Sequence, residues 1–497
     1  MTTTEPPTPA APDDAGVSAT AATPEPAAPV AANGDAEPSF WSVVFESLRG
    51  SRRDLTKTPL SRAILLLAVP MVLEMMGESV FAVADIFWVS KLGPDANATV
   101  TLTESMLTII YALSMGVAMG VGAIVARRTG ARDRDGASRA AVQAIIVGLG
   151  IALVLGLAGG LAGPTLLGVM GASPSVVASG AGFTRIMLGS CAVIVLLFVN
   201  NAAFRGAGDA SVTMRTLWLA NGINIVLGPI LIFGLGPAPR LGVTGAALAT
   251  AIGRGTGVLF QFWSLRRGAG RLSVRREHLA IDPEAMRTIF RIARRGALQM
   301  VIATSSWVGL VRILSTFGSS VLAGYGIAFR VIMFALLPSW GLGNAAATLV
   351  GQSLGAGTPE RGERAVWKAA FYNLIFLGVV GLGFVVFATP IVRLFSDVPA
   401  VVQYGSLCLR IVAAGFPFYA YGMVVSQAFN GAGDTLTPTL INLGCFWVGE
   451  IPLAYILAQP MGIGPQGVFI AIAAAFSAIA VVSVTIFRRG RWKTVRV

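Results

Sequence analysis

The sequence predicts an all-α protein that crosses a membrane about twelve times, in two repeated six-helix halves. Of its 497 residues, 55% are hydrophobic and 12% are charged, and the mean hydropathy is +0.73. Soluble domains usually carry about 25% charged residues. Apolar stretches of roughly 20 residues, the length that spans a bilayer, recur along the chain. The segment FRGAGD at 204–209 returns as FNGAGD at 429–434, which indicates an internal duplication.

The N-terminal region precedes the first spanning segment. Residues 1–38 are rich in Pro, Ala and Thr and lack an apolar core, so we expect a disordered cytoplasmic tail. In residues 39–57, Phe40, Trp41 and Phe45 share one helical face, and arginines follow them. This pattern is typical of a helix that lies on an anionic membrane surface. A frayed linker is the alternative for this segment.

Hydrophobic length places the spans in order along the chain. They lie near residues 60–90, 100–127, 138–162, 180–204, 212–235, 242–264, 287–315, 325–352, 365–388, 404–429, 438–458 and 466–487. Lys and Arg precede the first span and gather after the second, sixth, eighth and twelfth, whereas the loops after odd-numbered spans carry few. This distribution predicts that both termini are cytoplasmic in a bacterial plasma (inner) membrane. It also explains the net charge of +13 without a nucleic-acid partner.

The duplication has one ungapped register over most of its length. The two repeated motifs are 434 − 209 = 225 residues apart, and the same offset pairs Gly116 with Gly341. We therefore expect an N-terminal lobe at 58–265 (spans 1–6) and a C-terminal lobe at 287–488 (spans 7–12), with a basic cytoplasmic linker at 266–286 and a basic tail at 489–497. An even number of spans per repeat relates the lobes by an axis along the membrane normal. A central cleft between such lobes suits alternating access, although some channels share this kind of repeat.

The first span carries three acids within an apolar stretch. Glu74, Glu78 and Asp85 fall on one helical face, because each residue turns the helix by about 100°. An acid near the bilayer centre is unfavourable by about 2.5–3.5 kcal/mol. We expect these carboxylates to face the bundle interior or a water-filled cavity, as ion-coupling residues or as partners in helix–helix hydrogen bonds. Pro70, about one turn before Glu74, is a candidate hinge because it lacks a backbone donor.

Other embedded polar groups suggest further site residues, each with an alternative structural role. Glu450 is predicted to contact a cationic substrate or an ion, or to stabilise the helix kink at Pro452. We expect Asn221 and Asn224, about one turn apart, to hydrogen-bond Asp85, to bind Na⁺ through their oxygens or to hold helices together. Met75 belongs to a methionine-rich region that suits a cavity for varied substrates or ordinary packing.

Several kinds of chemistry are missing from the sequence. No Gly-x-x-x-x-Gly-Lys-[Ser/Thr] nucleotide loop, Gly-x-Ser-x-Gly elbow, His-Glu-x-x-His or Cys-x-x-Cys motif occurs. The only histidine, His278, lies in a basic loop, and the three cysteines lie in apolar runs. We therefore predict a transporter that is not an enzyme, has no cofactor or resident metal and takes its energy from an ion or solute gradient.

Several motifs together resemble one transporter family. They are the AVP opening at 68–70, VADIFWVSKLG at 83–93, GVAMG at 116–120, NGIN at 221–224, EIPLAY at 450–455 and the two Gly-Ala-Gly-Asp turns. Over residues 58–490 the chain resembles the multidrug and toxic compound extrusion (MATE) family, and it is most similar to the DinF-like branch. The resemblance implies a monomeric antiporter of two six-helix lobes in the bilayer. It would export small cationic or amphipathic organic compounds in exchange for protons or Na⁺.

The resemblance also implies which residues couple ion entry to export. The leading coupling acid of the DinF-like branch corresponds to Asp85, and a fifth-helix amide corresponds to Asn224, so Na⁺ binding at these two residues is possible. This branch often has an Asp where the chain has Gly228, and Glu74 and Glu78 could take over part of its role. A lipid-linked oligosaccharide flippase or a metabolite exporter of related architecture is the alternative. A flippase predicts a cationic cavity, whereas the embedded charges recognised here are mostly acidic.

Overall fold

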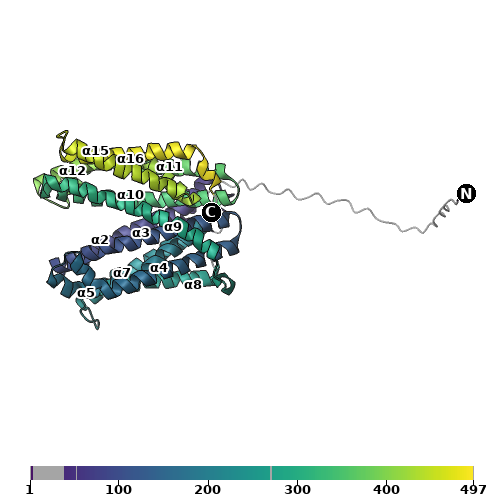
Figure 1. The fold of residues 1–497 in the computed structure, drawn as a ribbon, viewed down its shortest axis with the longest axis horizontal. Coiled ribbons are helices and arrows are strands. Elements are labelled where there is room, and N and C mark those ends of the chain that lie inside the picture. The colour runs from purple at the N-terminus through teal and green to yellow at the C-terminus, as the bar shows by residue number, and fades with distance from the viewer. Residues whose placement is uncertain (1, 4–38, 52, 269–270, 496–497) are drawn as a thin grey trace. The chain divides into compact units, whose positions relative to one another are not determined.

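A computed structural model describes residues 2–3, 39–51, 53–268 and 271–495, so nearly all of the predicted disordered tail at 1–38 lies outside the described residues. The described part of the chain contains helices and no strands, which confirms the all-α prediction (Figure 1). The first half comprises α1 (Phe40–Arg49), α2 (Leu60–Ser90), α3 (Pro94–Gly130), α4 (Arg134–Val169), α5 (Pro174–Gly189), α6 (Cys191–Ala207), α7 (Ala210–Phe233) and α8 (Val243–Arg267).

A short 3-10 helix, η1 (Arg276–Leu279), leads to the second half. That half comprises α9 (Pro283–Leu314), η2 (Ser315–Phe317), α10 (Ser319–Gly355), α11 (Pro359–Arg393), α12 (Pro399–Ala414), α13 (Phe416–Ala432), α14 (Leu436–Asn442), the π-helical η3 (Leu443–Glu450), α15 (Ile451–Ala458), α16 (Pro465–Arg488) and η4 (Arg491–Thr494). Within the described residues, eleven helical segments are long and apolar enough to span a membrane, with Pro174–Ala207 (α5–α6) and Leu436–Ala458 (α14, η3 and α15) each counted as one. The α12–α13 pair, bent by 59°, gives a twelfth when it is counted as one span. The predicted multi-span architecture is thereby confirmed.

The predicted surface helix at 39–57 is helical only over α1, which begins at Phe40 and ends at Arg49. Phe40, Trp41 and Phe45 are 56%, 66% and 59% exposed, while Val43 on the opposite face is buried. The exposed aromatic face remains available to a membrane surface, and that location stays a prediction.

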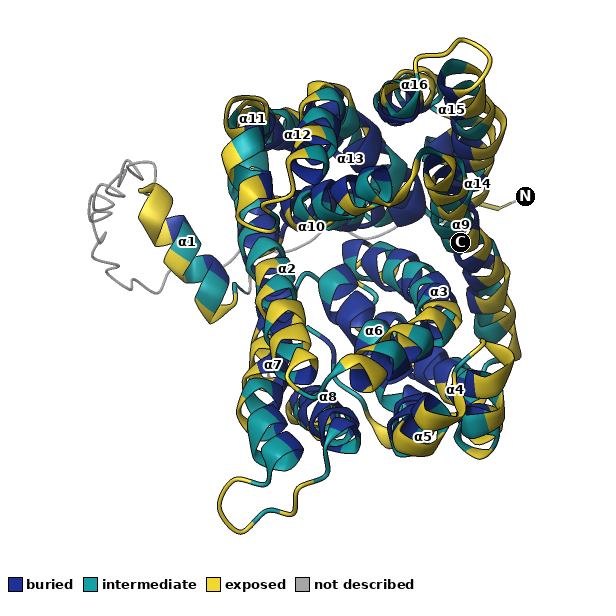
Figure 2. Cartoon of the chain, turned by 90° about the vertical axis from the view of Figure 1, so that its left-hand side faces the viewer, coloured by how far each residue is buried: buried dark blue, intermediate teal, exposed yellow. Residues whose placement is uncertain are grey.

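Two helices belong to the apolar cores of both halves. Ile64 and Met71, in the first part of α2, pack into a core made mainly of second-half residues. Ile289 and Ile292, in the first part of α9, pack into the core of the first half. Figure 2 shows α2 and α9 on opposite flanks of the junction between the halves. The two predicted lobes are therefore interlocked by these two helices.

The halves meet through glycines at the end of the bundle where α2 begins and α16 ends, here called the terminal end. A Cβ atom on Gly130 of α3 would collide with the carbonyl of Gln352 on α10. One on Gly355 of α10 would collide with the carbonyl of Arg127 on α3. The two glycines are 355 − 130 = 225 residues apart, so the repeat makes the same contact twice across its axis. Backbone packs directly on backbone here.

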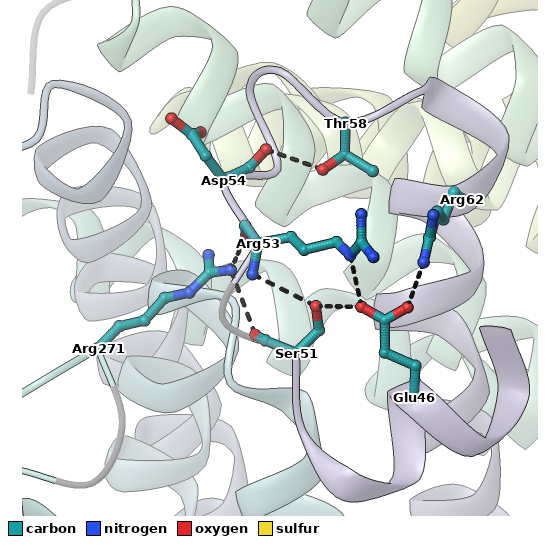
Figure 3. Close-up of polar contacts among 7 residues, drawn as sticks. All are labelled: Glu46, Ser51, Arg53, Asp54, Thr58, Arg62 and Arg271. Carbon is teal, nitrogen blue, oxygen red and sulfur yellow. Dashed lines mark hydrogen bonds and ion pairs between the residues drawn. The ribbon is translucent and has the colours of Figure 1, made fainter. Parts of the chain in front are cut away.

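A strap, formed by Ser51 and residues 53–59, joins α1 to α2 at the terminal end (Figure 3). The side chain of Arg271, in the loop before α9, donates to the carbonyls of Ser51 (3.4 Å) and Arg53. Arg361 on α11 donates to the carbonyls of Leu55 (2.8 Å) and Thr58. Because Arg361 belongs to the second half and Arg271 bonds the Ala207 carbonyl of the first, the strap ties the two halves together.

Glu46 anchors the start of the strap. Its carboxylate accepts from Arg53 Nε (2.8 Å), Arg62 Nη2 (2.5 Å) and Ser51 Oγ (2.8 Å) (Figure 3). Burial alone would raise the pKa of Glu46, but hydrogen bonds from Arg62, Ser51 and Arg53 outweigh it and lower the pKa below its usual range. A lowered folded-state pKa stabilises the fold above the unfolded pKa, and this contribution is lost as the pH falls through the folded value.

We therefore expect Glu46→Gln to lower the thermal unfolding midpoint of the purified protein at pH 6–8. The free energy of unfolding should fall by about 1 kcal/mol. The difference from the wild type should begin to shrink as the pH falls below the unfolded pKa of about 4.3, and it should vanish once the carboxylate is protonated in the folded wild type as well. Asp397→Asn, at an exposed acid in the loop before α12, is the control and should leave the midpoint unchanged at each pH. A deficit that persists unchanged into the acidic range would contradict this electrostatic role.

Gly355→Ala tests the glycine contact. A methyl group at Gly355 must push α3 and α10 apart, and such overpacking should destabilise the fold by about 1–3 kcal/mol. Gly378→Ala is a matched control on α11, where a Cβ meets nothing within 4 Å. Thermal unfolding followed by tryptophan fluorescence should show a lower midpoint for Gly355→Ala only. Equal midpoints for the two variants would mean that the contact is looser than described.

Candidate functional site

A cavity of about 370 Å³ lies between the two halves. The first-half wall is formed by α2, α3, α6, α7 and α8, and the second-half wall by α9, α10 and α13. The first-half wall contains four charged residues and three methionines: Glu74, Glu78, Arg205, Arg254, Met75, Met115 and Met119. The polar and aromatic residues of the second-half wall are uncharged: Trp340, Asn344, Thr348, Gln427 and Asn430.

The cavity ends before it reaches the terminal end. Two glycines line it where helices cross closely: a Cβ on Gly206 of α6 would lie 2.8 Å from the Gly122 carbonyl, and one on Gly431 of α13 would collide with the Ala347 carbonyl. Ala123, the last lining residue of α3, is seven residues, or about 10 Å, from the contact at Gly130. The backbone contact between α3 and α10 thus lies between Ala123 and the terminal end.

Glu74, one of the three predicted first-span acids, is fully buried in an ion pair. Its Oε1 accepts from Arg205 Nη1 on α6 (3.1 Å), and its Oε2 accepts from Thr213 Oγ1 on α7 (2.7 Å). These bonds fasten α2 to two other helices of the first half. By these contacts Glu74 fixes the position of α2 against α6 and α7. Its role in ion coupling stays a prediction.

Arg254 is a cavity residue that the sequence reasoning missed. It lies in the middle of α8, where its Nη1 donates to the Tyr111 hydroxyl (3.2 Å) and its guanidinium lies 5.7 Å from the centre of the Phe81 ring. Its charge acts on Glu78 and Asp85, although none of the described carboxylates lies within 4 Å of it. The rule that singled out the embedded acids applies equally to an arginine inside a span and would have found it.

The other two first-span acids differ in position. Glu78 lines the cavity, and both it and Asp85 are half-buried. Within the described chain, neither carboxylate makes a hydrogen bond or an ion pair of 4 Å or less. Asp85 lies about two turns beyond Glu78, within electrostatic reach of Glu104 on α3. The structure thus gathers Glu78, Asp85, Glu104 and Arg254 in one first-half cluster that holds both signs of charge.

The remaining predicted site residues are more scattered. Asn224 is buried and donates through Nδ2 to Thr250 Oγ1 (2.8 Å), not to Asp85. Asn221 and Glu450 are buried without lining the cavity, and both have an unpartnered polar atom, Nδ2 and Oε2 respectively. Met75 lines the cavity, and Pro70 lies within the unbroken helix α2.

Two observations concern cation binding: the space beside Gly228, and how the potential metal ligands are arranged among the described residues. A Cβ at Gly228 would meet only Trp88, at 3.9 Å, so the fold has room for a larger side chain beside α2. Among the residues described, no three His, Cys, Asp or Glu side chains converge as a metal site. A single carboxylate needs no such convergence to bind a proton.

A membrane-spanning bundle with two repeated halves around a charged cavity defines a protein of the secondary-transporter class. The MatE family model matches residues 70–230 and 297–456, which together exceed half of the chain. The chain belongs to this family, the MATE transporters, and the predicted family membership is confirmed. The comparisons do not single out the DinF-like branch, which stays a prediction.

Individual relatives agree with this membership. The chain is 25% identical over 427 residues to the Bacillus subtilis protein named "Probable multidrug resistance protein YoeA", covering 85% of this chain and 92% of that protein. It is 26% identical over 411 residues to a Shewanella oneidensis protein named "FAD transporter", covering 81% and 89%. A solved structure described as the outward-facing conformation of a multidrug resistance MATE transporter superposes with a TM-score of 0.82 at 27% identity, covering 88% and 97%.

The Glu74–Arg205 pair generates a stability prediction. Arg205→Met leaves Glu74 buried without its counter-ion, so the free energy of unfolding should fall by about 3–5 kcal/mol. Adding Glu74→Gln should recover part of this loss, because a neutral amide can still accept from Thr213. Arg266→Met, at an exposed arginine of α8, is the control. Additive losses in the double variant, measured by thermal unfolding in detergent, would show that the two side chains are not coupled.

Proposed function

We propose that this chain exports small cationic or amphipathic organic compounds through the central cavity in exchange for protons, by alternating access. The single observation that carries the proposal is the cavity itself, which places carboxylates, methionines and aromatic rings between two repeated halves. Flexible methionines suit substrates of varied shape. The name of the Bacillus subtilis relative supports multidrug compounds as substrates. The chain would act as a monomer in a bacterial plasma membrane.

The charge distribution supports a cytoplasmic terminal end. Arginines cluster in the loops at this end, as at Arg127–Arg134 and Arg266–Arg276, and such residues favour the cytoplasmic side. Both chain termini would then be cytoplasmic. The glycine contact between α3 and α10 would close the cavity toward the cytoplasm, as in an outward-facing state. The outward-facing neighbour with a TM-score of 0.82 agrees with this orientation.

The first-half cluster favours protons over Na⁺. A hard metal cation takes several oxygen ligands at once, whereas a proton needs one carboxylate oxygen. Asn224 Nδ2 donates to Thr250 Oγ1, so this amide is not bonded to Asp85, and the positive charge of Arg254 acting on Asp85 disfavours a metal cation there. We therefore propose Asp85 and Glu78 as the proton-binding residues. Na⁺ coupling at Asp85 and Asn224 is the alternative that the transport experiment below would detect.

Protonation would change the balance of charge between α2 and α8. While Asp85 is ionised, it attracts Arg254 and any cationic substrate in the cavity. A proton on Asp85 removes that attraction, so the substrate loses a partner and α2 becomes free to bend at Pro70. Because α2 packs in both apolar cores, such a bend would change the contacts between the halves. Coupling requires only that proton and substrate favour different states.

Export of an anionic metabolite is a second candidate function. The cavity is less acidic than the sequence suggested, because Arg205 and Arg254 line it together with Glu74 and Glu78. One relative is named "FAD transporter", and FAD carries an anionic diphosphate. Proteoliposomes that move FAD but not ethidium would favour this candidate.

The proposed coupling predicts the behaviour of reconstituted protein. In proteoliposomes without Na⁺, an imposed proton gradient should drive ethidium transport by the wild type. Asp85→Asn should reduce this flux to that of empty liposomes, because a neutral amide cannot exchange a proton. The matched control Asp397→Asn changes an exposed acid outside the cavity and should transport normally.

Three outcomes would overturn parts of this proposal. Flux driven only by a Na⁺ gradient at fixed pH would replace the proton by Na⁺. Proton-driven flux that survives Asp85→Asn would move the coupling acid to Glu78, Glu74 or Glu450. Wild-type protein that moves ethidium under neither gradient would exclude cation antiport.

A further inference from the structure

The two walls of the cavity are built from equivalent positions of the repeat. Residues 225 apart in the sequence face the same cavity from opposite halves. Apart from Gly122 with Ala347 and Gly206 with Gly431, the pairs are Met75 with Met300, Met115 with Trp340, Met119 with Asn344, Ala123 with Thr348, Ala202 with Gln427 and Arg205 with Asn430. The duplicated backbone thus presents each position twice, and the side chains at five of these six pairs differ in chemistry.

The second-half wall carries uncharged hydrogen-bonding groups at positions where the first-half wall is apolar. Asn344 and Gln427 stand where the first half has Met119 and Ala202. No Asp, Glu, Lys or Arg of the second half lines the cavity among the residues described. Attraction to a charged group of a bound compound must therefore come from the first-half wall. The second-half wall can recognise only shape and neutral hydrogen-bonding groups.

Several of these polar groups lack a protein partner. Asn430 is 5% exposed, and its Oδ1 has no partner, although its Nδ2 donates to Gln427 Oε1 (3.0 Å). The Gln427 side chain is positioned by α10, because a Cβ on Gly343 would lie 3.0 Å from its Cγ. The half-buried amide of Asn344 makes no hydrogen bond within the described chain. A buried amide atom without a partner is unfavourable by about 1–3 kcal/mol, which a ligand can relieve.

An aromatic ring completes this wall. Trp340 is half-buried and lines the cavity on the same wall as the amides. Opposite it, Met115 and Met119 offer polarisable, adaptable surface. A flat ring can lie against this apolar surface while the amides reach the donors and acceptors on its edge.

We propose that Trp340, Asn344, Gln427 and Asn430 form a subsite for uncharged heteroaromatic rings that carry an amide or imide edge. The first-half wall then holds the apolar or charged remainder of the compound. The subsite rests on the proposed function in that it adds a substrate class to the same cavity. It requires neither a coupling ion nor a particular membrane orientation.

Binding of two flavins to purified protein in detergent tests the subsite. Riboflavin carries an uncharged three-ring system with an imide edge, and 3-methylriboflavin has the imide N–H blocked. We expect the wild type to bind riboflavin about 2- to 12-fold more tightly, the range for one net hydrogen bond. Asn344→Met and Gln427→Ala copy the residues of the first half, and each should reduce this preference toward 1. Flavin fluorescence quenching measures all six affinities, those of two flavins for three proteins.

Controls separate recognition from folding. Asp397→Asn, at an exposed acid outside the cavity, should keep the flavin preference. Equal wild-type affinities for the two flavins, or no binding of either, would overturn the subsite whether or not any variant folds. A preference that survives both amide substitutions would also overturn it. A wild-type flavin preference without gradient-driven ethidium flux would instead reject the proposed cation antiport and retain the subsite.

Discussion

The structure depends on the backbone-to-backbone contact between α3 and α10. Gly130 and Gly355 leave no space for a Cβ atom, so the helices meet more closely there than side chains would permit. Tightly packed interfaces of this kind are bistable: they are either formed or broken, because small adjustments create clashes or voids. The contact therefore gives the molecule one well-defined closed end. The cavity, the strap and the interlocked cores are all arranged around it.

Charge and packing meet in α2. Its first part lies in the core of the second half, whereas Glu74 is bonded to Arg205 and Thr213 of the first half. Asp85, farther along the same helix, is free of such bonds and sits within reach of the Arg254 charge. Val89, about one turn beyond Asp85, is buried in the first-half core, so the free carboxylate lies between two packed segments of the helix. In the proposed cycle, a change of charge at Asp85 would act on the whole segment of α2 that follows Pro70.

The spans, the duplication and the three first-span acids could be predicted because each is encoded locally, in hydrophobic length or repeated motifs. The interlocking of α2 and α9 could not be predicted, because it depends on which half of the protein the apolar face of each helix packs against. The same limit applies to Asn221 and Glu450, whose burial away from the cavity follows from helix rotation in the packed bundle. Arg254 differs, because its position inside a span was readable and its chemistry was overlooked.

The duplication also explains why the two walls differ so sharply. Position 74 of the first half corresponds to Gln299, and position 205 to Asn430, so the Glu74–Arg205 ion pair is matched by two amides. A buried charge without its partner is strongly destabilising, so the two positions can change only together. Both amides retain an unpartnered oxygen, at Gln299 Oε1 and Asn430 Oδ1. The second half is therefore without charge at this site but keeps free hydrogen-bonding capacity, so the proposed ion coupling and the proposed neutral recognition would occupy opposite walls of one cavity.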